Sequence, residues 1–219
     1  MRAEGLQVFP LDDRGSFAWM LGPSDPVSRT SAALVVAGGT VLIDPVDSPE
    51  LDGRLASLPA VVGVVTLLDR HQRDAAPLAE RLGVPRLTPR ALGGAGVSLD
   101  GVEERSVVES RRWREALLWL PERRLLVCAE VLGTAGFDLA RRGDRLGMHP
   151  LARLHPPRAA FQGLDPATIA VGHGPPLREG ASPALERVLR TGRRELPLNW
   201  ARVLAEAVRA WPAARRARR

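Results

Sequence analysis

A valine-rich apolar run is followed by a polar segment and then by apolar residues at helical spacing. The run at residues 61–68 carries no charge, which is typical of a strand buried on both faces. Apolar residues at positions 75, 76, 78, 79 and 82 predict one face of a short helix. The polar segment between them, residues 69–74, reads D-R-H-Q-R-D. Because α/β proteins tend to place their chemistry between the carboxyl end of a strand and a helix, this segment is the first candidate site.

Two hairpins are the other strong patterns. Their apolar runs flank a Gly-Gly turn in the first case and a Pro-Glu-Arg turn in the second. The expected strands are Ser31–Val36 and Thr40–Ile43 in the first hairpin, and Ala116–Leu120 and Arg124–Ala129 in the second. Each second strand delivers an acidic residue, which is Asp44 in the first hairpin and Glu130 in the second. Asp44 precedes a proline, so a simple turn-forming role is an equal alternative for it.

The remaining elements are shorter. Further strands are expected at Gln7–Phe9, Phe17–Leu21, Pro85–Thr88 and Thr168–Val171. Further helices are expected at Ser48–Leu58 and Ser182–Arg190, each counted from the serine that caps it, and at Arg158–Gly163 and Leu198–Ala210. Residues 89–110 predict a glycine-rich loop with edge strands, and residues 133–157 predict an irregular excursion.

The order of these elements predicts the fold class. Strands followed by helices occur twice, in halves of roughly 1–110 and 111–219, with no linker-like stretch between them. We therefore expect a single α/β domain, built as a four-layer αββα sandwich whose sheets face each other with helices outside. Polar residues at the ends of strands, including His173 after the strand at 168–171, then converge on one cleft.

Composition narrows the setting. The net charge of +6 comes entirely from arginine on the basic side, since the chain has no lysine, and it is concentrated in the tail 213–219. Such a tail either contacts nucleic acid or is a solvated terminus, and we expect the latter. A single cysteine, Cys128, excludes an internal disulfide. Apolar runs too short for a bilayer and the absence of a signal-type N-terminus predict a cytoplasmic protein with no membrane partner.

Three segments together resemble the metallo-β-lactamase superfamily, whose members are αββα hydrolases and related proteins. They are G-T-V-L-I-D at 39–44, L-W-L-P-E-R-R-L-L at 118–126 and V-G-H-G-P-P-L at 171–177. The resemblance extends from about Ser31 to Leu189 and implies the same sandwich fold, with a metal centre at the strand ends.

The chain departs from the family in its metal motif. The family carries His-x-His-x-Asp-His where this chain has residues 69–74, so only the second histidine is kept, as His71. The resemblance places Arg111 at the next family histidine, Glu130 at the bridging aspartate and His173 at the final histidine. Asp69, Arg73 and Asp74 stand at the other motif positions.

One hypothesis keeps a single divalent ion. By resemblance, its ligands are Asp69, His71, Asp74, Glu130 and His173. This donor set suits zinc, iron or manganese. The protein is then a glyoxalase-like or thioesterase-like hydrolase in which an ion-bound water attacks a small ester or thioester, His71 and Asp74 belong to the catalytic machinery, and Asp74 orients the water.

The second hypothesis, which we favour, has no tight dinuclear centre. A unit positive charge about 5 Å from a dication costs several kcal/mol at an effective dielectric constant of about 20. Arg73 and Arg111 therefore oppose metal binding, and their guanidinium groups are expected to pair with the neighbouring carboxylates. The cleft then binds a small acyl or anionic ligand through these two arginines, with hydrolysis weak or lost.

Other residues receive plainer interpretations. His149 and His155, each beside a proline, are expected at the surface or as capping residues. Trp113 and Cys128 are expected to pack in the core. Nucleic-acid processing is a third class of function, and we rank it last because the basic residues are not interleaved with aromatic ones.

Overall fold

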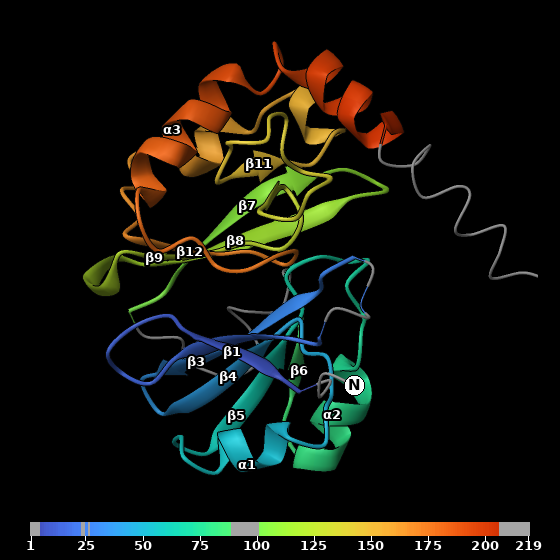
Figure 1. The fold of residues 1–219 in the computed structure, drawn as a ribbon. Helices are drawn as coiled ribbons and strands as arrows, with labels where there is room; N and C mark the ends of the chain where they lie inside the picture. The colour runs from blue at the N-terminus through green and yellow to red at the C-terminus, as the bar shows by residue number, and fades with distance from the viewer. Residues whose placement is uncertain (1–4, 23–24, 26, 89–100, 206–219) are drawn as a thin grey trace, which may run out of the picture.

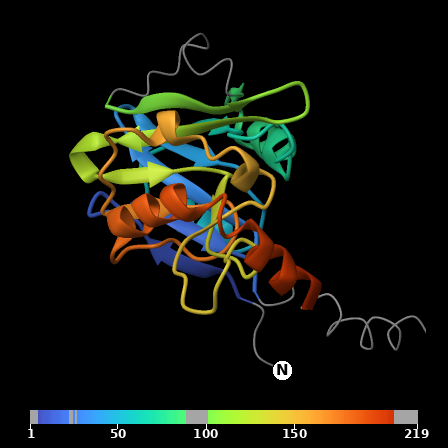
Figure 2. The ribbon, with the colours of Figure 1, turned by 90° about the horizontal axis from the view of Figure 1, so that it is seen from above.

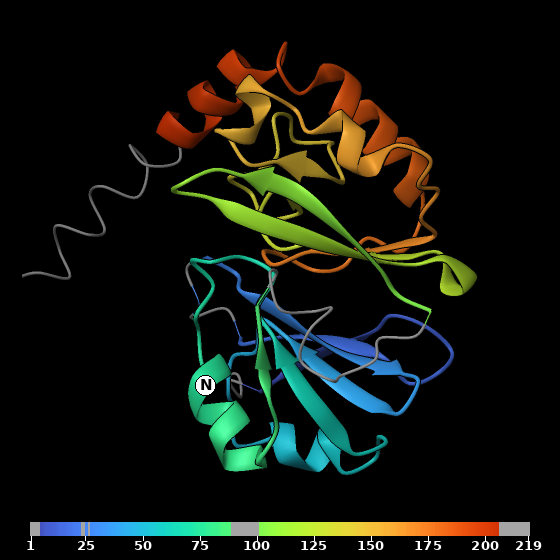
Figure 3. The ribbon, with the colours of Figure 1, turned by 180° about the vertical axis from the view of Figure 1, so that it is seen from behind.

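The computed structural model describes residues 5–22, 25, 27–88 and 101–205. Within these residues the strands form two main sheets that face each other, and helices cover the outer side of each sheet (Figures 1 and 3). The predicted αββα sandwich is therefore confirmed. Predictions for residues 89–100, for the end of the helix expected at Leu198–Ala210 and for the basic tail lie outside the described residues.

The first sheet is built from the N-terminal strands. They are β1 (Gln7–Pro10), β2 (Phe17–Met20), β3 (Thr30–Val36), β4 (Gly39–Ile43), β5 (Val61–Val65) and β6 (Arg86–Leu87), in that spatial order. Neighbours from β1 to β4 are antiparallel, whereas β5 is parallel to both β4 and β6. The outer face carries helices α1 (Leu51–Leu55) and α2 (Ala75–Leu82) (Figure 1).

Strand alternation divides the apolar residues of the first sheet between two cores. In β4, Val41 and Ile43 belong to the large core between the sheets, and Leu42 belongs to the smaller core under the helices. The β3–β4 turn requires glycine at position 39, because a Cβ there would lie 2.6 Å from the carbonyl oxygen of Ala60. Both faces of this sheet are thus buried, as the valine-rich run predicted.

The second sheet has the order β12-β9-β8-β7. Its strands are β7 (Glu103–Glu109), β8 (Arg114–Leu120), β9 (Leu125–Val127) and β12 (Thr168–Ala170). Here β7 and β9 flank β8 in antiparallel fashion, and β12 is parallel to β9. Because β7 pairs with β8, residues 103–109 belong to the second sheet, and the boundary between the halves lies before β7 rather than near residue 110.

Irregular structure and helices cover the outside of the second sheet. The turn η1 (Pro121–Arg123) joins β8 to β9 at the end of the sheet. On the outside, the short strands β10 (Leu132–Gly133) and β11 (Gly147–Met148) pair with each other, and single 3-10 turns occur at η2 (Ala152–Leu154) and η3 (Arg158–Phe161). Helix α3 (Ala181–Thr191) and a second helix at residues 196–205 lie over these segments (Figure 2). In the described residues no helix has the length and apolar character needed to cross a membrane.

Three helix boundaries differ from the predictions. Helix α1 begins at Leu51 and ends at Leu55, three residues short at each end, and it contains Gly53, a poor helix former. Helix α3 begins at Ala181 after a left-handed Gly180, so Ser182 lies inside the first turn rather than at its cap. The helix expected at Arg158–Gly163 is the 3-10 turn η3. In each case local backbone geometry moved the boundary while the element kept its place in the fold.

Candidate active site at the strand ends

Asp44 is the first residue after β4, and its side chain holds the His71 ring in place. Its backbone is left-handed, with φ at 42°, and the residue is 2% exposed. One carboxylate oxygen, Oδ1, accepts from the Leu67 N–H at 3.0 Å, and Oδ2 lies 3.1 Å from Nδ1 of His71. Asp44 therefore does more than shape a turn, because its carboxylate fixes the His71 ring through Nδ1.

The imidazoles of His71 and His173 meet at the centre of the site. Their Nε2 atoms lie 3.3 Å apart, which is hydrogen-bond distance for one shared proton. His173 is held from the other side by the carbonyl oxygen of Val27, at 2.9 Å from Nδ1. Position 172 before His173 requires glycine, because a Cβ there would lie 2.2 Å from the carbonyl oxygen of Ala129 and 3.0 Å from the His71 ring.

His173 is uncharged at neutral pH. Burial lowers its pKa to about 4, the neighbouring His71 and the positive charge of Arg73 act in the same direction, and the bond to Val27 and the charge of Glu130 oppose them. Since its Nδ1–H donates to the Val27 carbonyl, its Nε2 atom presents a lone pair toward His71.

Arg73 lies beside the imidazole pair, in a left-handed backbone conformation with φ at 39°. Its Nη1 group donates to the carbonyl oxygens of Thr30 at 2.6 Å and Asp44 at 2.8 Å, and Nη2 donates to that of Gly172 at 2.8 Å. These acceptors belong to three separate chain segments from both halves of the sandwich. Burial lowers the Arg73 pKa, although an arginine remains charged at neutral pH.

Glu130 follows β9 and is bound by two cationic or basic side chains. Its Oε2 atom lies 2.7 Å from Nη2 of Arg70, and its Oε1 atom lies 3.4 Å from Nε2 of His149. The Arg70 guanidinium also stacks 4.9 Å over the ring of Trp113, and the His149 ring meets Trp113 edge-on. Arg70, Trp113, Glu130 and His149 are called the Arg70 cluster below.

A fully buried carboxylate supports the loop that carries Glu130. Glu115 on β8 accepts from the main-chain N–H groups of Ala129, Glu130 and Val131, and from Nε1 of Trp113 at 2.9 Å. Burial raises the Glu115 pKa to about 7 in spite of these donors, which favour the charged form. Glu115 therefore sets the position of two members of the Arg70 cluster.

The other predicted site residues lie away from the imidazole pair or have other partners. Asp69 is exposed, and its N–H donates to the Arg114 carbonyl. Asp74 precedes α2, and its Oδ2 atom accepts from the Asp47 N–H at 2.9 Å rather than pointing to the pair. Arg111 is exposed in the turn between β7 and β8.

The expected ion-pair network is therefore wrong in its partners. Arg70 binds Glu130, whereas the guanidinium of Arg73 is taken up by main-chain carbonyls and that of Arg111 stays at the surface. Arg70 occupies a variable position of the family motif, so the motif did not predict a role for this residue. An arginine beside a candidate ligand was the signal that could have identified it.

His149 and Glu115 were also missed. His149 was expected at the surface or as a capping residue. Its Nδ1 atom does accept from the Leu151 N–H at 3.3 Å, just before η2, but the ring is largely buried rather than at the surface, and burial lowers its pKa. The His-Pro pattern does not show this, because the long excursion between β9 and β12 folds back over the site. Glu115 sits in an apolar strand, R-E-A-L-L-W-L, and an acidic residue in such a strand is the signal that should have marked it.

The metal centre that the resemblance implies does not fit these residues. Within the described ranges no three His, Cys, Asp or Glu side chains come together in an arrangement that could hold an ion. Glu130, the acidic group that the family motif would supply, faces Arg70 instead. A dinuclear centre needs more donors than one imidazole pair provides.

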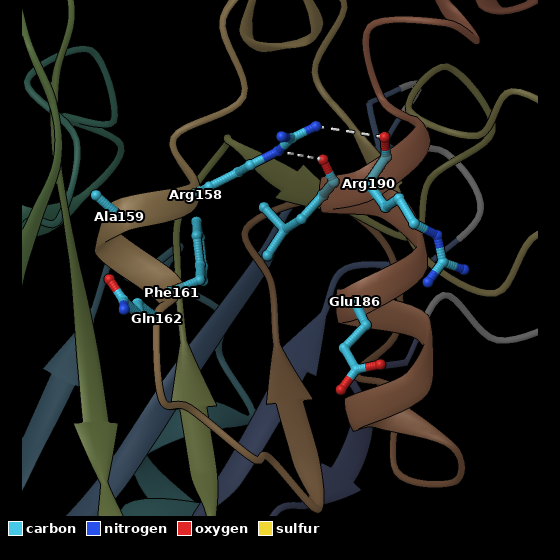
Figure 4. Close-up of a pocket in the computed structure, with 7 residues that line it drawn as sticks. Arg158, Ala159, Phe161, Gln162, Glu186 and Arg190 are labelled. Carbon is cyan, nitrogen blue, oxygen red and sulfur yellow. Dashed lines mark hydrogen bonds between the residues drawn. The ribbon is translucent and has the colours of Figure 1, made fainter.

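A hollow with a volume of about 600 Å³ lies outside the second sheet, between η3 and α3 (Figure 4). It is lined by Arg158, Ala159, Phe161, Gln162, Glu186, Leu189 and Arg190. Figure 4 shows Arg158 reaching across to the carboxyl end of α3, where it donates to the carbonyls of Leu189 at 3.0 Å and Arg190 at 3.4 Å. This arginine is a helix cap, and we assign the hollow no chemistry.

No family model and no curated protein matches this chain. Solved structures share its architecture. The flavodiiron core of Flv1 from Synechocystis sp. PCC6803 gives a TM-score of 0.60 at 15% identity, over 89% of this chain and 62% of that one. A metallo-β-lactamase from Erythrobacter litoralis gives 0.59 at 15% identity, over 89% and 95% of the two chains. The DIM-1 metallo-β-lactamase gives 0.55 at 12% identity, over 85% and 97%. Likeness at such low identity establishes the fold alone, and on that ground the chain has the metallo-β-lactamase fold.

Proposed function

We propose that this protein binds a small anionic or acyl ligand at the strand-end cleft without a dinuclear metal centre, with hydrolytic activity weak or lost. The observation that carries the proposal is the 2.7 Å contact between Arg70 and Glu130. It neutralises the carboxylate that would otherwise complete a metal site, and it leaves a partly exposed guanidinium at the strand ends.

Arg70 is the group best placed to receive the ligand. Its side chain is 44% exposed, and it lies between Glu130 and the Trp113 ring. Guanidinium groups bind carboxylates and phosphates in bidentate fashion, so an anionic ligand can exchange with Glu130 for the same donors. Arg111, exposed in the adjoining turn, is a second anion partner, as the sequence proposed. Arg73 is a weaker candidate because three carbonyls already take its donors.

The test is a thermal-shift screen with short-chain carboxylates, esters and thioesters, each run with and without EDTA. A ligand should raise the Tm of the wild-type protein equally in both conditions, because binding stabilises the native state independently of metal. The shift should disappear in Arg70→Met. It should persist in Arg14→Met, which breaks an exposed ion pair with Glu122 of similar type. A shift that EDTA abolishes, or that survives in Arg70→Met, contradicts the proposal.

A mononuclear hydrolase is the second candidate, and one observation favours it. The Nε2 atoms of His71 and His173 face each other at 3.3 Å, and two imidazoles bound to one ion also bring their nitrogens close together. Metal analysis of protein purified without chelator separates the two functions. About one equivalent of zinc, iron or manganese, together with chelator-sensitive thioester hydrolysis, would establish the hydrolase instead.

A further inference from the structure

The position of Arg73 carries an inference about why the imidazole pair stays together without an ion. We infer that the Arg73 guanidinium is a built-in cation that clamps the loops around His71 and His173 and, by its charge, keeps divalent metal away from them. The sequence already predicts that Arg73 opposes metal binding by its charge, and the new part is the clamp that its three carbonyl contacts form.

The first step of the argument is the identity of the three acceptors. The Asp44 carbonyl belongs to the residue whose carboxylate fixes His71, and the Gly172 carbonyl belongs to the residue before His173. The third acceptor, the Thr30 carbonyl, lies at the start of β3. One planar group therefore binds the chain next to both imidazoles at once.

The second step is that the clamp joins the two halves of the sandwich. Thr30 and Asp44 belong to the first sheet, and Gly172 follows β12 of the second. The Gly172 carbonyl also accepts from the Thr30 N–H at 2.8 Å, so Arg73 reinforces a direct contact between the halves. An ion with ligands on loops of both halves would hold the same segments together, which is why a guanidinium can take over that structural task.

The third step is charge. Arg73 is always protonated, it is largely buried, and its acceptors are neutral carbonyls rather than carboxylates. No carboxylate of the described residues binds Arg73 directly, although the negative charges of Asp44, Asp25 and Glu130 act on it from nearby. The guanidinium charge acts in turn on whatever binds between the imidazoles. A dication there meets repulsion that is screened less than at the surface.

This inference rests on the proposed function in one respect, since both concern a site that works without a dinuclear centre. The experiment compares Arg73→Lys with Arg73→Met. Lysine keeps the charge but loses the planar fork, whereas methionine loses both. Zinc affinity is measured by calorimetry and the free energy of unfolding by urea denaturation.

Both variants should unfold at clearly lower urea concentration than wild type, because each loses the clamp. Only Arg73→Met should bind zinc more tightly, by about tenfold or more over Arg73→Lys, and adding His173→Asn should remove that gain. Arg14→Met, which removes an exposed arginine outside the site, should leave both quantities unchanged. Equal zinc affinity in the two Arg73 variants, or wild-type stability in Arg73→Lys, overturns the inference.

The experiment distinguishes a failure of the Arg73 inference from a failure of the proposed function. If the wild-type protein already holds an ion, the metal-independent function fails, but the ratio between the two Arg73 variants still decides the inference. If both variants fail to fold, NMR of arginine-labelled wild-type protein decides it. An Arg73 guanidinium with slowed rotation and contacts to Gly172 supports the clamp, and a freely rotating one overturns it.

Discussion

Nη2 of Arg70 lies 2.7 Å from Oε2 of Glu130, although 60 residues separate the two along the chain. The pair joins the loop after β5 of the first sheet to the loop after β9 of the second. Glu130 is the residue at which the resemblance places a metal ligand, and its carboxylate is bound by a guanidinium instead. The expected consequences of this arrangement can be measured.

Replacing Arg70 by methionine should raise the pKa of His149. The positive charge of Arg70 is one of the causes that hold the His149 pKa below its usual range, after burial. The negative charge of Glu130 remains after this substitution, and it favours the protonated form of His149. NMR titration of the His149 ring protons measures the change, and Arg14→Met is the control. A lower or unchanged pKa would show that Arg70 does not act on His149 in solution.

Acid should destabilise the protein through His173. Its folded pKa of about 4 lies below the value near 6.5 of an unfolded histidine, so the unfolded state binds more protons between these two pH values. Stability from this group is fully present above pH 6.5 and is lost as the pH falls toward 4, by up to about 3 kcal/mol. Urea denaturation at pH 7 and pH 4.5 should show a smaller difference for His173→Asn than for wild type. Equal differences would refute the shift.

Glu115 should make the protein less stable at higher pH, which is the opposite of the effect of His173. Its folded pKa of about 7 lies above the unfolded value of 4.5, so the folded state binds more protons in this window and loses stability as the pH rises through it. Glu115→Gln should lack this fall. The variant should also be less stable by roughly 2–3 kcal/mol. The side-chain NH2 group of the new glutamine would face main-chain N–H groups, so a donor would meet donors where the carboxylate accepts from them now. Denaturation at pH 5 and pH 8 measures both effects, with the exposed Glu109→Gln as control. A pH slope like that of wild type would contradict the assignment.

Gly133 should tolerate no side chain while Asp138 is present. A Cβ at Gly133 would overlap the Asp138 carboxylate, whose two oxygens are buried and have no hydrogen-bond partner among the described residues. Burial raises the Asp138 pKa well above its usual range. Gly133→Ala should cost about 2 kcal/mol or more, and Asp138→Asn should be close to neutral at pH 7. Thermal denaturation of both variants checks this, and a strongly destabilised Asp138→Asn would reveal a partner for the carboxylate.

Much of the fold followed from local patterns. The uncharged valine run, the Gly-Gly turn and the Pro-Glu-Arg turn predicted β3 to β5 and β8 to β9, because strand alternation and turn chemistry act over a few neighbouring residues. The αββα arrangement followed because such strands must bury both faces. Exact helix ends did not follow, since they depend on single backbone angles such as that of Gly180.

The residue types at the strand ends can be read from the chain alone: His71 and His173 are kept, and arginines and carboxylates stand at the other motif positions. Their partners depend on how the two sheets pack. The tertiary structure brought His71 to His173 across 102 positions, gave Glu130 to Arg70 and gave Arg73 to three carbonyls. The reason is physical: an arginine side chain is long enough to choose among several acceptors, and the packing of the two sheets, which no local pattern encodes, sets which acceptor lies within reach.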